Sequence, residues 1–302
     1  MPMFLGIDAG GTKTECAVAD ASTILGRATA GSCKLLKVGR ERAARELAAA
    51  VHQALADAGC EMQDIASCCV GLAGASHPEV FAWTRKTMET LLDAPCVIVG
   101  DNLIALEAAF QGGAGIIVVS GTGSIAFGRN ADGVTARAGG WGPTISDEGS
   151  GHWIGRMAAS RAMRAWDAGR NSVLVDKLMA SWRVRTREEM VALVNASPSP
   201  EFADLVPRVA EAAANGDASA LQIMKDAGAE LAELALSVLW RLWRDASGVN
   251  LCVAGGVLQN REPVRNALRE SLAAKQKGLI WDERPVDPVS GAIFLAKKMM
   301  NG

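Results

Sequence analysis

Apolar residues in the first third of the chain occur in short runs that are typical of buried strands, separated by segments with helical spacing. Residues 4–14 predict an apolar strand with Asp8 at its end and then a turn, after which a strand resumes at 15–20. The same pattern predicts strands at 23–28, 65–72 and 96–100, helices at 41–58 and 78–92, and a loop at 31–39. A strand hairpin followed by alternating helices and strands is typical of an α/β domain.

The middle of the chain repeats this design. After a helix that begins near Leu103 and a glycine-rich segment at 111–115, residues 115–130 predict an apolar strand, a turn of glycines and hydroxyls, and another strand. The rest is mostly helical, with helices predicted at 153–167, 188–195, 218–245, 263–275 and 287–300, a loop at 198–200 and a strand at 249–254. We therefore expect two α/β domains, residues 1–110 with 288–302, and residues 111–287.

The composition is that of an ordinary soluble globular protein. The chain has 302 residues, enough for two cores, of which 49% are hydrophobic and 21% charged. A formal net charge of −2 gives no electrostatic reason to expect binding to nucleic acid or to a membrane surface. The first residues lack the basic and apolar regions of a signal peptide, and the most apolar window, 115–120, is too short to cross a bilayer.

Cysteine and histidine residues are scattered. The seven cysteines, at positions 16, 33, 60, 68, 69, 96 and 252, form no C-x-x-C pair, which favours reduced thiols in a cytoplasmic protein and argues against a zinc or iron–sulfur site. The three histidines, His52, His77 and His152, lack metal-ligand spacing, so we expect surface or structural roles.

The tryptophans at 153, 166, 182, 240 and 243 are expected to fill a core or a subunit interface.

The turn after the first strand is suited to binding phosphate. It contains Gly10, Gly11, Thr12, Lys13 and Thr14. The glycines let backbone N–H groups approach an anion, the threonines supply hydroxyl donors, and the lysine adds positive charge. Asp8 could hold Mg²⁺ through water, whereas the alternative is a tight hairpin with a solvated aspartate. The segment is not a P-loop, because Lys13 follows Thr12 and a strand comes next.

The second turn has a similar make-up, with Gly121, Thr122, Gly123 and Ser124. Gly121, Gly123 and Ala126 also fit the dinucleotide fingerprint, but that motif must open a helix, and the pattern here predicts a hairpin. The alternative for Thr122 and Ser124 is that their hydroxyls only stabilise this hairpin.

Three further positions are candidates. Asp101 follows the strand at 96–100, and its alternative role is the N-cap of the next helix. Gly255 and Gly256 follow the strand at 249–254. Asp147 and Glu148 precede a glycine, where they could equally form a turn or begin the helix at 153.

The order of these motifs resembles that of the sugar kinase, actin and heat-shock-chaperone ATPase superfamily. Within it, the chain is most similar to the N-acetylglucosamine kinase group of the BadF/BadG/BcrA/BcrD ATPase family. The resemblance covers nearly the whole chain and implies two ribonuclease-H-like α/β domains with a nucleotide cleft between them. It also implies an ATP-dependent, Mg²⁺-dependent kinase that phosphorylates a hydroxyl of an amino sugar, most simply the 6-hydroxyl of N-acetylglucosamine or glucosamine.

The resemblance also implies a role for each motif. Residues 10–14 and 121–124 would bind the ATP phosphates, Gly255 and Gly256 the adenosine, and Asp8 the Mg²⁺ ion. Asp101 would be the catalytic base and contact the sugar. The remaining sugar-binding residues would be Thr122, Gly140, Trp141, Asp147 and Glu148. Family-level expectations also include a homodimer and closure of the two domains over the substrates.

One loop departs from the family pattern. Members of this kinase group usually carry a sugar-contacting asparagine after the third strand, but residues 31–37 contain none. Lys34 and Lys37 could both be solvated, or one of them could pair with an anionic substituent, such as the lactyl carboxylate of N-acetylmuramic acid. The loop could also select a different sugar. The chain could also be a sugar or nucleotide sensor without catalytic activity. An activator ATPase of the 2-hydroxyacyl-CoA dehydratase type is a further possibility within the same family, although such a protein requires cluster-binding cysteines.

Overall fold

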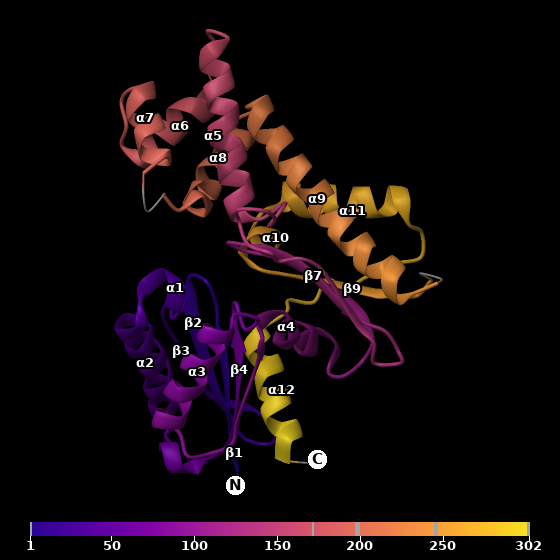
Figure 1. Ribbon diagram of the computed structural model, residues 1–302. Coiled ribbons are helices and arrows are strands. Elements are labelled where there is room, and N and C mark those ends of the chain that lie inside the picture. Colours follow the sequence, from indigo (N-terminus) through magenta and orange to yellow (C-terminus); the bar gives the residue numbers. More distant parts are fainter. Residues whose placement is uncertain (1, 171, 197–199, 245–246, 301–302) are drawn as a thin grey trace. The chain divides into compact units, whose positions relative to one another are not determined.

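Figure 1 shows the computed structural model of the chain, in which residues 2–170, 172–196, 200–244 and 247–300 are described. The chain divides into two compact units. The first consists of residues 1–115 and 286–302, and the second of residues 116–285. Each unit contains one five-stranded sheet with flanking helices, so the α/β prediction is confirmed.

The sheet of the first unit has the strand order β3-β2-β1-β4-β5. The strands are β1 (Met3–Ala9), β2 (Lys13–Ala19), β3 (Ile24–Gly31), β4 (Ile65–Leu72) and β5 (Cys96–Gly100). The first three strands are antiparallel neighbours, whereas β1, β4 and β5 run parallel. In the register of these parallel strands Ala9 is opposite Leu72, which is opposite Gly100. The residues that follow β1 and β5 therefore meet at one edge of the sheet.

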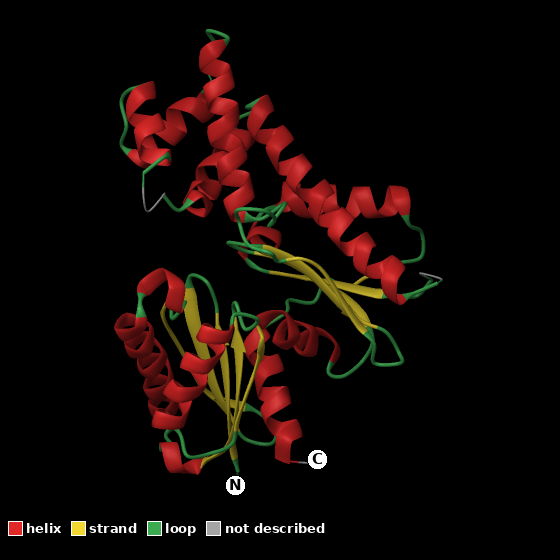
Figure 2. Cartoon of the chain, in the orientation of Figure 1, coloured by secondary structure: helices red, strands yellow, loops and turns green. Residues whose placement is uncertain are grey.

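Helices cover both faces of this sheet (Figure 2). They are α1 (Leu35–Val38), α2 (Arg40–Ala58), α3 (Pro78–Leu91), α4 (Asp101–Phe110) and α12 (Pro288–Met300), with a 3₁₀ turn, η1 (Met62–Asp64). Leu5 and Ile7 of β1 face the core formed with α2 and α3, whereas Phe4 faces the core formed with α4 and α12. This alternation follows from the two-residue period of a strand. Gly6 lets α12 approach closely, since a Cβ there would lie 2.9 Å from the backbone oxygen of Val289.

The second unit has the strand order β10-β9-β6-β7-β8. The strands are β6 (Gly115–Ser120), β7 (Ser124–Arg129), β8 (Thr135–Gly139), β9 (Asn250–Ala254) and β10 (Ile280–Trp281). The helices are α5 (Gly151–Asp167), α6 (Val173–Trp182), α7 (Arg187–Val194), α8 (Val206–Ala214), α9 (Ala218–Leu242), α10 (Gly256–Asn260) and α11 (Glu262–Lys275), with a 3₁₀ turn, η2 (Phe202–Leu205). The core joins sheet residues such as Ile116 and Val118 to the apolar stripe of α9.

Several local predictions need correction. The predicted loop at 31–39 contains the end of β3 and the short helix α1. Helix α5 begins at 151 and not at 153, because the Ser150 side chain accepts a hydrogen bond from Trp153 N at 3.1 Å and so caps the helix. Helix α9 ends at Leu242, and its predicted end at 245 lies outside the described residues, as does most of the predicted loop at 198–200.

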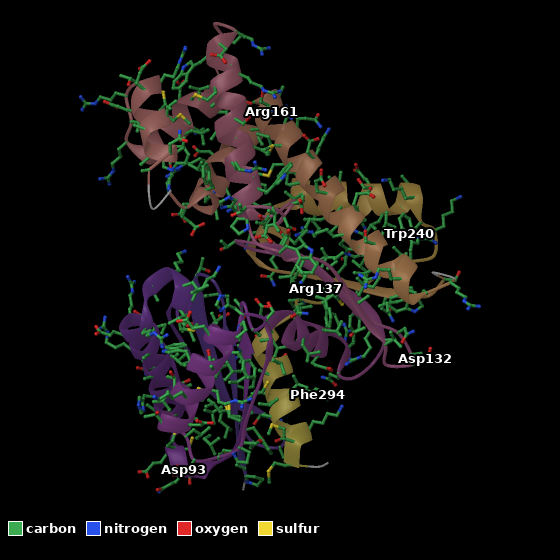
Figure 3. The ribbon with its side chains drawn as sticks, viewed as in Figure 1. Asp93, Asp132, Arg137, Arg161, Trp240 and Phe294 are labelled. Carbon is green, nitrogen blue, oxygen red and sulfur yellow. The ribbon has the colours of Figure 1, made fainter. Side chains whose placement is uncertain are left out.

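The tryptophans divide into two groups. Those at 153, 166, 182 and 243 are partly buried against the core of the second unit. Trp240 is 59% exposed, so it does not belong to that core (Figure 3). Among the described helices, none is both long and apolar enough to cross a membrane.

Candidate functional site

The hairpin between β1 and β2 is the first candidate phosphate site. Ala9 is opposite Thr14 in the strand register, so residues 10–13 connect the two paired positions, with Lys13 already in β2. A Cβ at Gly10 would lie 3.2 Å from the backbone oxygen of Lys13, whereas Gly11 has open space around it. Thr12 and Lys13 are exposed, and Lys13 Nζ pairs with Glu15 Oε1 at 2.8 Å. The tip of the hairpin therefore presents backbone, one hydroxyl and a partly neutralised lysine.

The second threonine of this motif is part of the framework. Thr14 is buried, and its Oγ1 donates to the backbone oxygen of Gly31 at 2.9 Å. Ser32 adds a second brace, because its Oγ donates to the backbone oxygen of Gly11 at 3.1 Å. These two bonds tie the end of β3 to the hairpin. The sequence pattern did not indicate Ser32, since nothing in it showed that residues 31–32 pack against the hairpin.

Asp8 lies in a concentration of negative charge at the end of β1. Burial and the nearby charges of Asp101, Glu15 and Asp287 together raise the pKa of its carboxyl from 3.8 to about 7, while Lys13 opposes them. At neutral pH the group is therefore poised between its protonated and ionised forms. A divalent cation would favour the ionised form, because it adds positive charge where carboxylates accumulate.

Asp101 is the first residue of α4, directly after β5. Gly100 holds the N-cap position, so the alternative role of Asp101 as the N-cap is wrong. Burial raises the pKa of Asp101, whereas a hydrogen bond from Asn102 N at 2.9 Å and the positive charge of Lys34 lower it. Its side chain is thus a partly buried carboxylate held at the carboxyl edge of the sheet.

The segment after β3 brings Lys34 toward this edge. Cys33 and Leu35 on either side of it are buried, whereas Lys34 itself is exposed. Its backbone N donates to Ser32 Oγ at 3.2 Å, and its ammonium group is near enough to Asp101 to oppose the effect of burial on the pKa of that carboxyl. Lys37 is also exposed, on the short helix α1.

The turn between β6 and β7 is the second candidate phosphate site, and it is braced by the start of α5. Gly151 N donates to Gly121 O at 2.8 Å, and His152 N donates to Thr122 O at 3.1 Å. Ser124 is buried, and its Oγ donates to the backbone oxygen of Glu148 at 2.6 Å. This turn joins two strands, as predicted, and does not open a helix in the manner of a dinucleotide site.

Asp147 lies directly behind this turn. It is only 6% exposed and has a backbone φ of +66°, a conformation that aspartate tolerates better than most residues. Its Oδ1 accepts a hydrogen bond from Ser124 N at 3.4 Å, and a Cβ at Gly123 would lie 3.0 Å from Oδ2. The glycine therefore makes room for the carboxylate. Of the two structures that the sequence allowed for this segment, the turn is correct, and α5 begins only at Gly151.

Glu148 and Trp141 are more accessible. Glu148 is half-buried, and its Oε2 accepts a hydrogen bond from Ser146 Oγ at 3.1 Å. Trp141 is 61% exposed, and the guanidinium carbon of Arg137 lies 3.7 Å from its ring centroid. Arg137 belongs to β8 (Figure 3). Gly140 has a φ of +70°, and a Cβ there would lie 2.8 Å from Ile125.

The glycines after β9 approach the same turn. Gly255 has a φ of +87°, and a Cβ there would lie only 2.4 Å from the backbone oxygen of Ser120 at the end of β6. Gly256 begins α10, whose last residue is followed by Arg261. Arg261 Nε is buried and has no hydrogen-bond partner in the part of the chain that the structure describes. The sequence did not single out this arginine.

The structure thus gathers the predicted residues in two places. In the first unit, Asp8, Asp101 and the hairpin at 10–14 lie at one sheet edge, with Lys34 beside them. In the second unit, the turn at 121–124 packs against Asp147 and Gly255. Within the described residues, no group of three or more His, Cys, Asp or Glu side chains could hold a metal ion by itself. Asp8 still fits Mg²⁺, which keeps several waters and needs only one or two carboxylates.

Comparison with known proteins gives consistent matches along the whole chain. Residues 5–296 match the BadF/BadG/BcrA/BcrD ATPase family. The chain is 30% identical to the N-acetylmuramic acid/N-acetylglucosamine kinase of Clostridium acetobutylicum, over 98% of this chain and 99% of that protein. It is 27% identical to the N-acetyl-D-glucosamine kinase of Dictyostelium discoideum, over 97% of each chain. The crystal structure of a proposed N-acetylglucosamine kinase from Chromobacterium violaceum matches with a TM-score of 0.79 and 26% identity, over 98% of this chain and 99% of that one.

Proposed function

Because the chain belongs to the BadF/BadG/BcrA/BcrD ATPase family, we propose that it is an ATP-dependent kinase that transfers a phosphoryl group to a hydroxyl of an amino sugar. The observation that carries the proposal is the position of Asp101. Its carboxylate is held at the carboxyl edge of a parallel sheet, beside Asp8 and a glycine-rich hairpin. Phosphoryl transfer depends mainly on such positioning and on neutralisation of charge.

Nucleotide binding is assigned to residues of both units. Gly10, Gly11 and Thr12 at the tip of the first hairpin supply backbone and hydroxyl donors to phosphate, as do Thr122 and Gly123 in the second. Thr14 and Ser124 act by holding their hairpins in shape, because their hydroxyls already donate to backbone oxygens. Gly255 and Gly256 present backbone to the nucleoside, and Lys13 adds positive charge at the rim.

Mg²⁺ is the second part of the proposal. Asp8 would hold the ion through water, which accords with the accumulation of carboxylates around it. When bound, the ion neutralises phosphate charge during the transfer. The protein's own contribution is to keep Asp8 fixed at the end of β1.

Asp101 acts as the catalytic base. Its carboxylate accepts the proton of the sugar hydroxyl while the hydroxyl oxygen bonds to the γ-phosphorus and the bond from phosphorus to the ADP oxygen breaks. Asp147 and Glu148 accept hydrogen bonds from the sugar, and the exposed ring of Trp141 and the backbone at Gly140 line its position. Acceptors that are left without a partner penalise a substrate that lacks the matching hydroxyl.

The acceptor is assigned as the 6-hydroxyl of N-acetylglucosamine or glucosamine. A second acceptor, N-acetylmuramic acid, is favoured by one observation, the exposed ammonium group of Lys34 close to Asp101. A lactyl carboxylate on the sugar would pair with this lysine. The seven cysteines are scattered along the sequence and form no C-x-x-C pair, which gives no support to an iron–sulfur activator ATPase.

The test is ADP release measured with a panel of N-acetylglucosamine, glucosamine, N-acetylmuramic acid and glucose, each with and without Mg²⁺. We expect sugar-stimulated release that requires Mg²⁺, with the phosphate found on the 6-oxygen of the product by NMR. Sugar binding without turnover would instead identify a sensor. A lack of stimulation by every sugar would contradict the proposal.

We also propose that the protein is a cytoplasmic homodimer. None of its seven cysteines forms a disulfide, which accords with a reducing compartment. Light scattering after size exclusion would test the dimer, and a mass equal to one chain across the working concentration range would reject it.

A further inference from the structure

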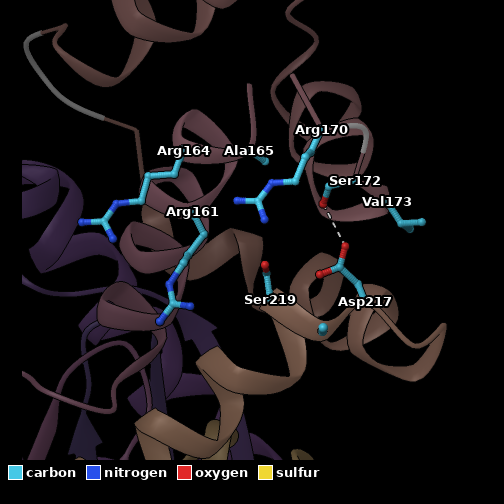
Figure 4. Close-up of a pocket in the computed structure, with 9 residues that line it drawn as sticks. Arg161, Arg164, Ala165, Arg170, Ser172, Val173, Asp217 and Ser219 are labelled. Atoms are coloured by element: carbon cyan, nitrogen blue, oxygen red, sulfur yellow. Dashed lines mark hydrogen bonds between the residues drawn. The ribbon is translucent and has the colours of Figure 1, made fainter. Parts of the chain in front are cut away.

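The helical part of the second unit contains another candidate ligand site, distinct from all the residues assigned above. A cavity of about 530 Å³ lies between the last turns of α5 and the beginnings of α6 and α9 (Figure 4). The polar and charged side chains that line it are Arg161, Arg164, Arg170, Ser172, Asp217 and Ser219. Its volume is within the range of roughly 300–1,000 Å³ that is common for small-molecule sites.

Three arginines give this cavity its charge. Arg161 and Arg164 are three residues apart on α5 and therefore lie on one face of that helix, whereas Arg170 follows the helix. Arg161 pairs with Asp226 at 3.2 Å. Neither Arg164 nor Arg170 has a side-chain hydrogen bond or ion pair within the described part of the chain. Two guanidinium groups are thus available to a ligand.

The one carboxylate in the wall is already engaged by the protein. Asp217 caps α9 by accepting from Ala220 N at 3.0 Å, and it accepts from Ser172 Oγ at 2.8 Å. Burial opposes ionisation here, but the hydrogen bonds from Ala220 and Ser172 lower the pKa of Asp217. The Asp217 carboxylate therefore links the start of α6 to the start of α9. The cavity wall contains three arginines and this one carboxylate.

Helix geometry and hydroxyl groups add to the attraction for an anion. Both α6 and α9 begin at this cavity with partial positive charge in their first turns, whereas the last turn of α5 contributes partial negative charge. Figure 4 shows the guanidinium group of Arg170 and the hydroxyl of Ser219 directed toward the same space. A planar guanidinium group matches two phosphate oxygens at once, and a hydroxyl can donate to a third.

We propose that this cavity binds the phosphate monoester of a small polar molecule, with a sugar phosphate as its occupant. Arg164 and Arg170 bind the phosphate, and the rest of the cavity accommodates the polyhydroxy part. The site is separate from the second phosphate hairpin, because Arg164 is thirteen residues beyond the start of α5 at Gly151, which corresponds to roughly 20 Å along the helix.

The experiment is isothermal titration of glucose 6-phosphate into the full chain, with saturating ADP, Mg²⁺ and N-acetylglucosamine present to occupy the proposed catalytic site. The test variant is Arg164→Gln/Arg170→Gln. The control is Arg185→Gln, because Arg185 is an exposed arginine of the same unit outside the cavity. We expect the wild type and the control to bind alike and the test variant to bind at least tenfold more weakly. Circular dichroism checks that all three proteins are folded.

Two further ligands decide what the site recognises. Glucose lacks the phosphate, so it should not compete, and inorganic phosphate lacks the sugar, so it should bind more weakly than glucose 6-phosphate. If inorganic phosphate binds with the same affinity as glucose 6-phosphate, the occupant is the free phosphate ion and not a sugar phosphate. Unchanged binding of glucose 6-phosphate by the double variant would contradict the proposed binding site. This conclusion does not depend on whether the chain is a kinase.

Discussion

Next to burial, the carboxylate of Asp101 is the strongest influence that raises the pKa of Asp8, although β4 separates β1, which contains Asp8, from β5, which Asp101 follows. The parallel register explains this, because the carboxyl ends of β1, β4 and β5 lie at one edge of the sheet. Two acidic side chains more than ninety residues apart in the sequence thereby become electrostatic neighbours. Their mutual repulsion is unfavourable for folding and useful for binding a cation.

The first prediction concerns the effect of Asp8 on stability. The unfolded chain releases this proton near pH 3.8 and the folded protein near pH 7, so the folded state holds more protons between these values. The contribution of the Asp8 carboxyl to the free energy of unfolding therefore decreases as the pH rises from about 4 to about 7. Asp8→Asn should raise the free energy of unfolding at pH 8, by at most about 4 kcal/mol, and change it little at pH 4.

Urea unfolding at the two pH values measures this difference. The control is Asp93→Asn, since Asp93 is exposed and lies before β5, at the opposite edge of the sheet (Figure 3). It should behave as the wild type does at both pH values. An Asp8 variant that is equally or less stable at pH 8 would mean that the repulsion is relieved in some other way.

The second prediction concerns Asp101 in catalysis. Asp101→Asn keeps the size of the side chain but cannot accept a proton, so turnover should fall by about two to four powers of ten. ADP affinity, measured by titration, should stay within about threefold of the wild type, because the nucleotide is bound by other residues. Asp93→Asn again serves as the control. Near wild-type turnover would exclude Asp101 as the base.

The third prediction concerns Lys34. Its charge counteracts the effect of burial on the pKa of Asp101, so Lys34→Gln should raise that pKa and move the acid limb of the pH profile of kcat/KM to higher pH. The same variant should lose activity toward N-acetylmuramic acid by more than toward N-acetylglucosamine, because only the former carries a carboxylate. Lys86→Gln, on the exposed face of α3, is the control. A profile that does not move would show that Lys34 is only solvated.

The fourth prediction concerns Gly255. Alanine at position 255 is unfavourable for two reasons. The backbone φ is +87°, and the added Cβ would lie 2.4 Å from the backbone oxygen of Ser120. Gly255→Ala should therefore lower the free energy of unfolding by roughly 2–5 kcal/mol. Gly133→Ala separates the two effects, because Gly133 also has a positive φ, of +80°, but no atom within 4 Å of its would-be Cβ. It should cost only about 1–2 kcal/mol, measured by the same urea titration. Equal costs would mean that the contact with Ser120 relaxes.

The sequence by itself was sufficient for most strands and most helices, because their patterns are local. The predicted strands at 65–72 and 96–100 match β4 and β5 at both ends. It gave no separate prediction for α6 or α8. It also missed α10 and β10, which are five and two residues long, since such short segments carry little periodic signal. It also missed the cap of α5, where Ser150 begins the helix before the apolar pattern does.

The motif residues could likewise be found in the sequence, but their individual tasks could not. Glycines and threonines at a turn look alike in a sequence, and only the packing showed that Thr14 and Ser124 brace their hairpins while Thr12 stays exposed. The acidic neighbours of Asp8, the proximity of Lys34 to Asp101, and the arginine-lined cavity all depend on which distant segments the fold brings together. Residue type and spacing determine the local backbone, whereas charge, burial and hydrogen bonding at a site are properties of the assembled surroundings.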